Sequence, residues 1–466
     1  MSKYLILVLI SCAPLYILGQ TTEKSFTLDE ALAMARERNL SLVIAREGIT
    51  TAKAEIKELN SLWYPRLAVT GEYSHSLTEI AAVTSVGTIA GELLENIAPA
   101  LSSNPIIEGL LDGIGASHIR LPIVPRNTAE VGAELAWVVF SGGRRFTATR
   151  IADRILSIAN EQYNATENGI AAAVAEAYWG LALARQLTGV RRSALALHSE
   201  HLRQARKLEE EGMINRTERL VAEVACKQSN TLLASAESEQ KVATKALATL
   251  LVADSLTIIP TTPLSVPQTI PTKEEFMTLV STAPTMNILR SGEKIASLTL
   301  RAERSRYLPT ISLLGHQNLW SSGLDKNIFP RTIVGVGLSW TLFDGLSREG
   351  AIARSKSSLR TAQTSQQKTL QELYTSIDKC YAVLTTSLDE YKAQQTTLAL
   401  AEELHRTQVR AFAEGMATSS DVVDATLRLS EVQLAQLETL YTIDTTLATL
   451  LMLVGRADSL TTYFKP

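Results

Sequence analysis

The chain has 466 residues, enough for two or three domains, and a formal net charge of −3. A charge this small gives no global field that would recruit nucleic acid or an anionic membrane surface. Aromatic residues make up only 5% of the chain, and the abundance of small, helix-forming residues argues against a thick globular core.

The first 19 residues have the pattern of a signal peptide. Lys3 supplies a positive charge, an apolar run extends from Tyr4 to Leu18, and cleavage is expected near Gly19. The run is too short to favour a lasting membrane helix. Cleavage before Cys12 in a lipoprotein pattern is the alternative, which ranks second because the apolar run continues past that residue. We therefore expect an exported protein.

Two very long stretches of the chain contain no proline. Prolines occur up to position 125, again from 260 to 330, and then only at 466. Because a proline inside a helix costs about 3 kcal/mol, the proline-free stretches can form long helices. The predicted long helices and their return helices span about 142–211, 217–252, 345–414 and 420–455. A helix of roughly 70 residues would be about 105 Å long.

Shorter helices are expected before the first long one. Thr27 can cap a helix, and Glu30 stands three residues later in a capping-box pattern. A second helix is expected at about 42–62, and it ends before Pro65 because the residue preceding a proline favours extended geometry.

Strands with alternating apolar residues lie between these helices. The predicted strands span about 66–75, 129–141, 310–320 and 332–343. Leu135 and Trp137 alternate with other residues in one of them, as Leu338 and Trp340 do in another, which predicts a sheet with one polar face. The stretch 76–128 lacks a clean period, and we expect an extended loop with at most a short helix there.

The whole plan occurs twice. Pro65 and Pro309 are 244 residues apart, whereas Trp137 and Trp340 are 203 residues apart. The second offset also relates the two Glu-Gly-Met turns that follow the long helices, so the 41-residue difference falls in the first strand-to-strand loop. We predict a duplicated chain with repeats at 20–258 and 272–466 and a proline-rich linker at 259–271.

The register of the duplication also bears on the cysteines. Cys226 lies 14 residues after Gly212, and Cys380 lies 35 residues before Gly415. If the two turns are level, the thiols are about 30 Å apart along the helices. A disulfide needs Cα atoms within about 7 Å, so none is expected.

Four strands with one apolar and one polar face cannot close a barrel alone. Their open edges would not be tolerated in lipid. Three chains would supply twelve strands, and together with the export signal this favours a trimeric barrel in an outer membrane.

The chain resembles the TolC-like outer-membrane efflux factor family over essentially everything after the signal peptide. The residues that carry the resemblance are Phe26-Thr27-Leu28-Asp29-Glu30-Ala31, Tyr64-Pro65-Arg66-Leu67, Leu342-Phe343-Asp344-Gly345 and Asp421-Val422-Val423-Asp424-Ala425. The resemblance implies a mainly α fold with a small β part. It also implies a homotrimer with a 12-stranded outer-membrane β-barrel, a continuous periplasmic α-barrel and a mixed equatorial domain.

The function implied by the resemblance is that of an exit duct in a tripartite efflux or type I secretion system. Such a duct passes small molecules, metal ions or polypeptides from an inner-membrane pump and a periplasmic adaptor protein to the outside. It contacts outer-membrane lipid, has a large periplasmic part, and needs no cofactor and no nucleic acid. The alternatives are an exported trimeric coiled-coil structural or adhesin protein and an exported enzyme.

Catalytic and metal-binding motifs are missing from the sequence, which argues against an enzyme. The six histidines form no paired metal motif. His198 and His201 are three residues apart, and we expect them on a solvated helix face. The sequence has no glycine-rich phosphate loop before a helix and no nucleophile motif.

The expected site is the closed tip, where two acidic residues begin the last long helix. Asp421 and Asp424 are three apart and share a helix face. Acidic residues suit a helix N-terminus, which is one interpretation. The resemblance favours another, in which threefold symmetry makes each a ring of carboxylates that selects cations at a constriction.

The resemblance also assigns gate and docking residues. Glu218 matches an acidic position that closes the gate through ionic links, but Phe412 and Ala417 stand where the family has a tyrosine and an arginine. The salt bridge is therefore either missing or rebuilt with Arg216 or Arg219. The expected adaptor-docking turns contain Gly212, Met213, Gly415 and Met416. Arg203, Arg206 and Lys207 either meet the adaptor or form a solvated face.

Overall fold

The computed structural model describes residues 22–77, 80–85, 118–124, 126–253, 256–322 and 330–464. The predicted signal peptide, Cys12 and most of the loop at 76–128 lie outside these residues. The chain forms two compact units. The helical unit consists of Met1–Lys53, Arg154–Glu293 and Arg360–Pro466, and the sheet unit consists of Ala54–Asp153 and Lys294–Leu359.

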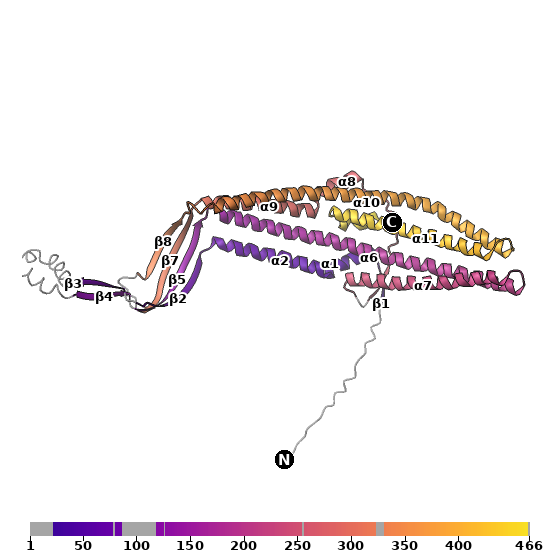
Figure 1. Cartoon of the computed structure of the whole chain (residues 1–466), viewed down its shortest axis with the longest axis horizontal. Coiled ribbons are helices and arrows are strands. Elements are labelled where there is room, and N and C mark those ends of the chain that lie inside the picture. The colour runs from indigo at the N-terminus through magenta and orange to yellow at the C-terminus, as the bar shows by residue number, and fades with distance from the viewer. Residues whose placement is uncertain are drawn as a thin grey trace, which may run out of the picture. The chain divides into compact units, whose positions relative to one another are not determined.

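Two helical hairpins of equal size dominate the chain (Figure 1). Their helices are α6 (Arg144–Glu210), α7 (Arg216–Leu250), α10 (Ser347–Ala413) and α11 (Ser419–Leu453). The long helices have 67 residues each and the return helices 35 each. Each helix of the second hairpin begins and ends 203 residues after its counterpart, which is the predicted offset.

The shorter helices repeat at the other predicted offset. They are α1 (Leu28–Arg38), α2 (Leu40–Asn60), α8 (Lys273–Leu279) and α9 (Pro284–Arg304), with 3-10 turns η1 (Ser61–Trp63), η2 (Val280–Thr282), η3 (Ser305–Tyr307) and η4 (Ala457–Tyr463). Helices α2 and α9 have 21 residues each and begin 244 residues apart. The predicted capping box of Thr27 and Glu30 is present at α1. The division into repeats at 20–258 and 272–466 stays a prediction.

The sheet unit contains a four-stranded antiparallel sheet in the order β2-β5-β7-β8. Its strands are β2 (Arg66–His75), β5 (Asn127–Phe140), β7 (Thr310–Ser322) and β8 (Thr332–Ser339). Cross-strand partners share a face, so Leu67 lies beside Leu135, while Glu72 lies beside Glu130 on the other face. The predicted apolar and polar faces are therefore present.

The strand predicted at 332–343 ends earlier, at Ser339. Ser339 pairs with Thr310, the first residue of β7. The preceding residue is Pro309, which has no N–H to extend the ladder. Trp340, Leu342 and Phe343 consequently lie outside the strand and are exposed.

Two further pairs of strands were not predicted. Within the stretch expected to be a loop, β3 (Ile80–Ser85) pairs antiparallel with β4 (His118–Val124). Pro122 inside β4 weakens its strand signal. In the helical unit, β1 (Thr22–Phe26) pairs in parallel with β6 (Leu256–Pro260). These two strands are only five residues long, too short to show a period.

The first strand-to-helix junction is held together by an indole and a guanidinium. Trp137 at the end of β5 donates its indole N–H to the carbonyl oxygen of Trp63, at 3.0 Å. The guanidinium of Arg145 lies 4.6 Å from the centre of a Trp63 ring, a cation–π contact. The same guanidinium donates to the carbonyl oxygens of Leu62 and Val139. The helix start, the strand end and the turn before β2 are thereby joined.

The second junction repeats this arrangement with equivalent residues. The Trp340 indole N–H donates to the Tyr307 carbonyl oxygen at 3.0 Å. The Arg348 guanidinium lies 4.6 Å from the Tyr307 ring and donates to the Leu342 carbonyl oxygen at 2.7 Å. Asp344 lies 3.2 Å from Arg348 and adds an ion pair. The recurring Trp and Arg of the sequence therefore have one structural purpose in both halves.

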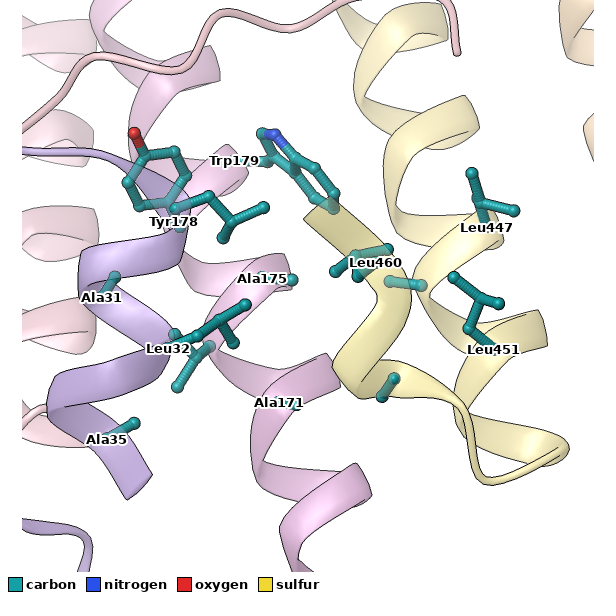
Figure 2. Close-up of a cluster of buried hydrophobic side chains, with 14 of the residues drawn as sticks. Ala31, Leu32, Ala35, Ala171, Ala175, Tyr178, Trp179, Leu447, Leu451 and Leu460 are labelled. Atoms are coloured by element: carbon teal, nitrogen blue, oxygen red, sulfur yellow. The ribbon is translucent and has the colours of Figure 1, made fainter. Parts of the chain in front are cut away.

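The core of the helical unit is built around α6 (Figure 2). Figure 2 shows Ala31, Leu32 and Ala35 of α1, Ala171, Ala175, Tyr178 and Trp179 of α6, Leu447 and Leu451 of α11, and Leu460. The Tyr178 hydroxyl accepts from the backbone N–H groups of Thr261 and Thr262 and donates to the Phe26 carbonyl oxygen, with distances of 2.8 to 2.9 Å. This hydroxyl thus ties β1 and the segment after β6 to α6.

One carboxyl in this unit is buried without a partner. Asp444 on α11 is fully buried, and neither of its oxygens has a hydrogen-bond partner. The Ser265 backbone faces the carboxyl without reaching hydrogen-bond geometry. Burial raises the pKa of this carboxyl well above its usual value, and the Ser265 backbone opposes the shift.

Replacing this carboxyl should stabilise the protein at neutral pH. Asp444→Leu should raise the free energy of unfolding by about 1–3 kcal/mol, since an unsatisfied buried group is removed. With a raised pKa, the folded state is most stable below the usual value of 3.8 and loses stability as pH rises towards the folded pKa. The gain should therefore be larger at pH 8 than at pH 5 in thermal unfolding. Asp153→Leu on exposed α6 is the control, and an equal gain at both pH values would contradict the assignment.

A matched pair of glycines tests the junctions. Gly142 has φ 64° and Gly345 has φ 66°, a region that costs other residues about 1–2 kcal/mol. A Cβ on Gly142 would lie 2.7 Å from the Ser305 carbonyl oxygen, whereas one on Gly345 would meet nothing within 4 Å. Gly142→Ala should therefore destabilise by about 1–3 kcal/mol more than Gly345→Ala in urea unfolding. Equal losses would show that the junction relaxes around the added methyl.

Candidate functional site at the hairpin turns

Both hairpins turn in the same way. Gly212 (φ 72°) and Gly415 (φ 76°) adopt the left-handed conformation just after the long helices. The N–H of the next residue, Met213 or Met416, donates to the carbonyl five residues earlier at 2.8 Å, which completes a Schellman motif. The two methionine side chains are 64% and 73% exposed. The turns thus present apolar side chains to solvent, as a docking surface requires.

Asp421 is part of the cap of α11. The Asp421 carboxylate accepts from the Thr418 backbone N–H at 2.8 Å, and the Thr418 hydroxyl accepts from the Asp421 N–H at 3.3 Å. The hydrogen bond from the Thr418 backbone, followed by the bond from its hydroxyl, lowers the pKa of Asp421. Asp424 is exposed one turn later on the same helix. The helix-start interpretation therefore describes Asp421 within one chain.

Glu218 connects the two hairpins. Its carboxylate accepts from the backbone N–H of Ser419 at 2.6 Å. This N–H is one of the free donors at the start of α11, so a residue of α7 caps a helix of the other hairpin. The Ser419 hydroxyl and the His201 Nε2 of α6 are 2.7 Å apart. Neither Ser419 nor His201 was predicted, because a single serine or histidine gives no signal in sequence.

The expectation of a solvated histidine face is wrong. His198 and His201 are only 6% and 5% exposed. The His201 ring packs edge-on against Phe412 with 4.6 Å between ring centres. Burial, and then the neighbouring His198, lowers the pKa of His201 to about 4, with the Ser419 contact opposing. His201 is therefore neutral at pH 7 and serves the tip as a packed, hydrogen-bonded side chain.

Phe412 lies inside the tip and not on its surface. It is 1% exposed. The buried residues that surround the tip are Leu202, Ala205, Ala222, Phe412 and Val422, with Ala417 packed against them. The phenyl and methyl groups at positions 412 and 417 thus add apolar packing where a polar pair was expected from the resemblance.

The arginines near the tip pair within the first hairpin. Arg219 lies 2.6 Å from Glu209 and also pairs with Glu223. Arg206 lies 4.0 Å from Glu223, and Arg203 lies 2.6 Å from Glu200. Among the described residues of one chain, no ion pair links the two hairpins at the tip. The salt bridge is therefore missing here, and Glu218 makes the cross-hairpin link through a backbone N–H.

Other predictions concern the cysteines and possible metal or membrane sites. Cys226 and Cys380 are both free, as predicted. In the described part of the chain, no group of three or more His, Cys, Asp or Glu residues is placed to hold a metal ion. Within the same ranges, no helix is both long enough and apolar enough to cross a membrane.

The fold defines a duplicated protein in which two long helical hairpins are joined to an amphipathic antiparallel sheet. Residues 116–252 and 284–456 match the family described as outer membrane efflux protein. The chain belongs to this family. Because the match covers both hairpins and most of the sheet, it includes the tip residues described above.

Individual proteins agree with this assignment. Protein CyaE of Bordetella pertussis is 25% identical over 306 residues, which are 63% of this chain and 62% of that protein. The chain thus matches less than two thirds of the length of this relative.

Solved structures share the fold over nearly the whole chain. A CusC structure gives a TM-score of 0.72 at 15% identity, covering 93% of each chain. The outer membrane protein VceC of Vibrio cholerae gives 0.71 at 14% identity, covering 92% of this chain and 96% of that one. The Campylobacter jejuni CmeC outer membrane channel gives 0.70 at 15% identity, covering 92% and 86%. At these identities the likeness is one of fold.

The cross-hairpin cap gives a direct prediction. Glu218→Ala should leave the Ser419 N–H without an acceptor and weaken the start of α11 by about 0.5–2 kcal/mol. Hydrogen exchange measured by mass spectrometry should then speed up over residues 419–422. Glu218→Gln, whose amide oxygen can still accept, should exchange at an intermediate rate. Glu211→Ala, an exposed glutamate in the turn, should change nothing, and unchanged exchange in Glu218→Ala would refute the cap.

Proposed function

We propose that the chain is the outer-membrane exit duct of a tripartite efflux or type I secretion system. One observation carries the proposal: a four-stranded sheet with an apolar and a polar face, attached to long helical hairpins. Family membership supports it, as does the fold likeness to a protein described as an outer membrane channel. Its cargo is a small molecule, a metal ion or a polypeptide.

The proposed duct is a homotrimer. Strands β2 and β8 are the edges of the sheet, and a free edge in lipid leaves backbone groups without partners. Joining β8 of one copy to β2 of the next would close twelve strands. The apolar face would then contact outer-membrane lipid through exposed side chains such as Leu67, Val334 and Val336, which are each 72% exposed. The polar face would line the passage.

The hairpin turns are the proposed contact with the periplasmic adaptor. Gly212 and Gly415 fix two equivalent turns, and each displays an exposed methionine. Methionine suits an adaptable apolar contact because its side chain is flexible and polarisable. The adaptor would connect the duct to an inner-membrane pump, with most of the helical unit in the periplasm.

The proposed gate lies at the same turns. Asp421 and Asp424 would form carboxylate rings, one of each from every copy, at the narrowest point. Glu218 would keep each copy's two hairpins together, and Phe412 would pack beneath that link. An exported coiled-coil adhesin, the other candidate, would have no need for a sheet with this duplicated pattern.

Conductance in planar bilayers tests the duct and its gate together. The purified protein should form cation-selective pores, and Asp421→Asn/Asp424→Asn should bring the cation-to-anion permeability ratio close to one, measured as reversal potential in a salt gradient. Asparagine removes the charge but keeps an acceptor for the helix cap. Glu402→Ala/Glu403→Ala, on exposed α10 positions, is the charge-matched control. Absence of pores would refute the duct, and unchanged selectivity would remove the two aspartates from the gate.

A further inference from the structure

A pocket of about 750 Å³ lies in the sheet unit where strands meet helix starts. Its walls come from the turn before β2, the end of β5, the start of α6 and the start of β7. Most of the wall is apolar, with Leu62, Tyr64, Pro65, Val138 and Leu314 among the lining residues. The pocket can therefore hold a hydrophobic body of drug-like size.

Three arginines line this pocket, and no lining residue is a carboxylate. Arg144 donates to the Ser141 carbonyl oxygen at 3.2 Å and to the Thr310 hydroxyl at 3.0 Å. Arg145 is held by the junction contacts described above. Arg66 is exposed, and no ion pair to it occurs among the described residues. Three positive charges beside apolar walls favour an anionic group on the ligand.

A buried hydroxyl in the same wall lacks a partner. Ser141 lies between β5 and α6, is 8% exposed, and its Oγ makes no hydrogen bond within the described part of the chain. Buried hydroxyls are normally satisfied, so an orphaned one that lines a pocket points to a ligand or a water that completes it. This observation is independent of the arginines.

The pocket belongs to the polar face of the sheet. Arg66 is the cross-strand partner of Ala136, and Ala136 is the partner of Leu314. The same face carries Glu72 and Glu134 further along the strands. A ligand reaching this pocket therefore comes from the side that the proposed function assigns to the passage, whereas membrane lipid would contact the opposite face.

We infer that this pocket binds a small amphiphilic organic anion from the passage, with its apolar body against the wall and its anionic group between Arg66 and Arg144. The binding chemistry stands on the pocket alone. The source of the ligand rests on the proposed function. Glu72 and Glu134 on the same face would repel such an anion from the rest of the strands and leave the pocket as its favourable position.

Equilibrium dialysis with naphthalene-2-sulfonate tests the inference, using the full chain in phosphatidylcholine nanodiscs and subtracting empty discs. The sulfonate should bind saturably and about tenfold more tightly than neutral 2-naphthol, since hydrogen bonds to a charged group are stronger. Arg66→Gln should weaken sulfonate binding about tenfold and leave naphthol binding unchanged. Ser141→Ala should weaken the sulfonate less. Arg150→Gln, an exposed arginine of α6 outside the pocket, should bind as the wild type does.

Several outcomes would overturn the inference. Equal affinity for sulfonate and naphthol would remove the anionic preference, and wild-type binding by Arg66→Gln would place the anion elsewhere. Loss of sulfonate binding when phosphatidylglycerol replaces phosphatidylcholine would show that lipid occupies the pocket. Pores in planar bilayers without sulfonate binding would refute this site alone, whereas sulfonate binding without pores would refute the duct and leave the pocket chemistry standing.

Discussion

An indole N–H donated to a carbonyl fixes where each strand ends and each long helix begins. Trp137 and Trp340 make this bond in equivalent positions, and a guanidinium stacked on the neighbouring ring closes the arrangement. A strand needs partners along its length and a helix needs them within itself, so the change from one to the other leaves carbonyls free. The arginines satisfy those carbonyls, and the adjoining pocket exists because these side chains are held in place.

The tip uses different chemistry for a similar purpose. Glu218 and His201 hold Ser419, so that the start of α11 is secured by residues of the first hairpin. The link uses a backbone N–H, which no substitution at position 419 other than proline would remove. With Phe412 packed beneath it, the two hairpins are joined by packing and capping, and a movement of one turn must disturb the other.

The sequence predicted the repeated elements well and the tip contacts poorly. Absent prolines and the recurring Trp137 and Trp340 were sufficient for the four long helices and the four-stranded sheet, since these depend on local pattern. The end of β8 depended on where its partner began, and β1 and β6 were too short to show a period. Ser419 and His201 contact each other across 218 residues, and no local pattern reports such a contact. For the same reason the burial of His198 was missed.

Equal helix lengths in the two hairpins restrict how this chain can change over evolutionary time. Adding one residue to α10 alone would rotate everything beyond it by about 100° and advance it by about 1.5 Å. The contacts of Ser419 with residues of the first hairpin would then be lost. Substitutions can therefore accumulate independently in the two copies, whereas insertions and deletions are confined to the connections between strands. The 41 residues by which the copies differ in length fall in one such connection.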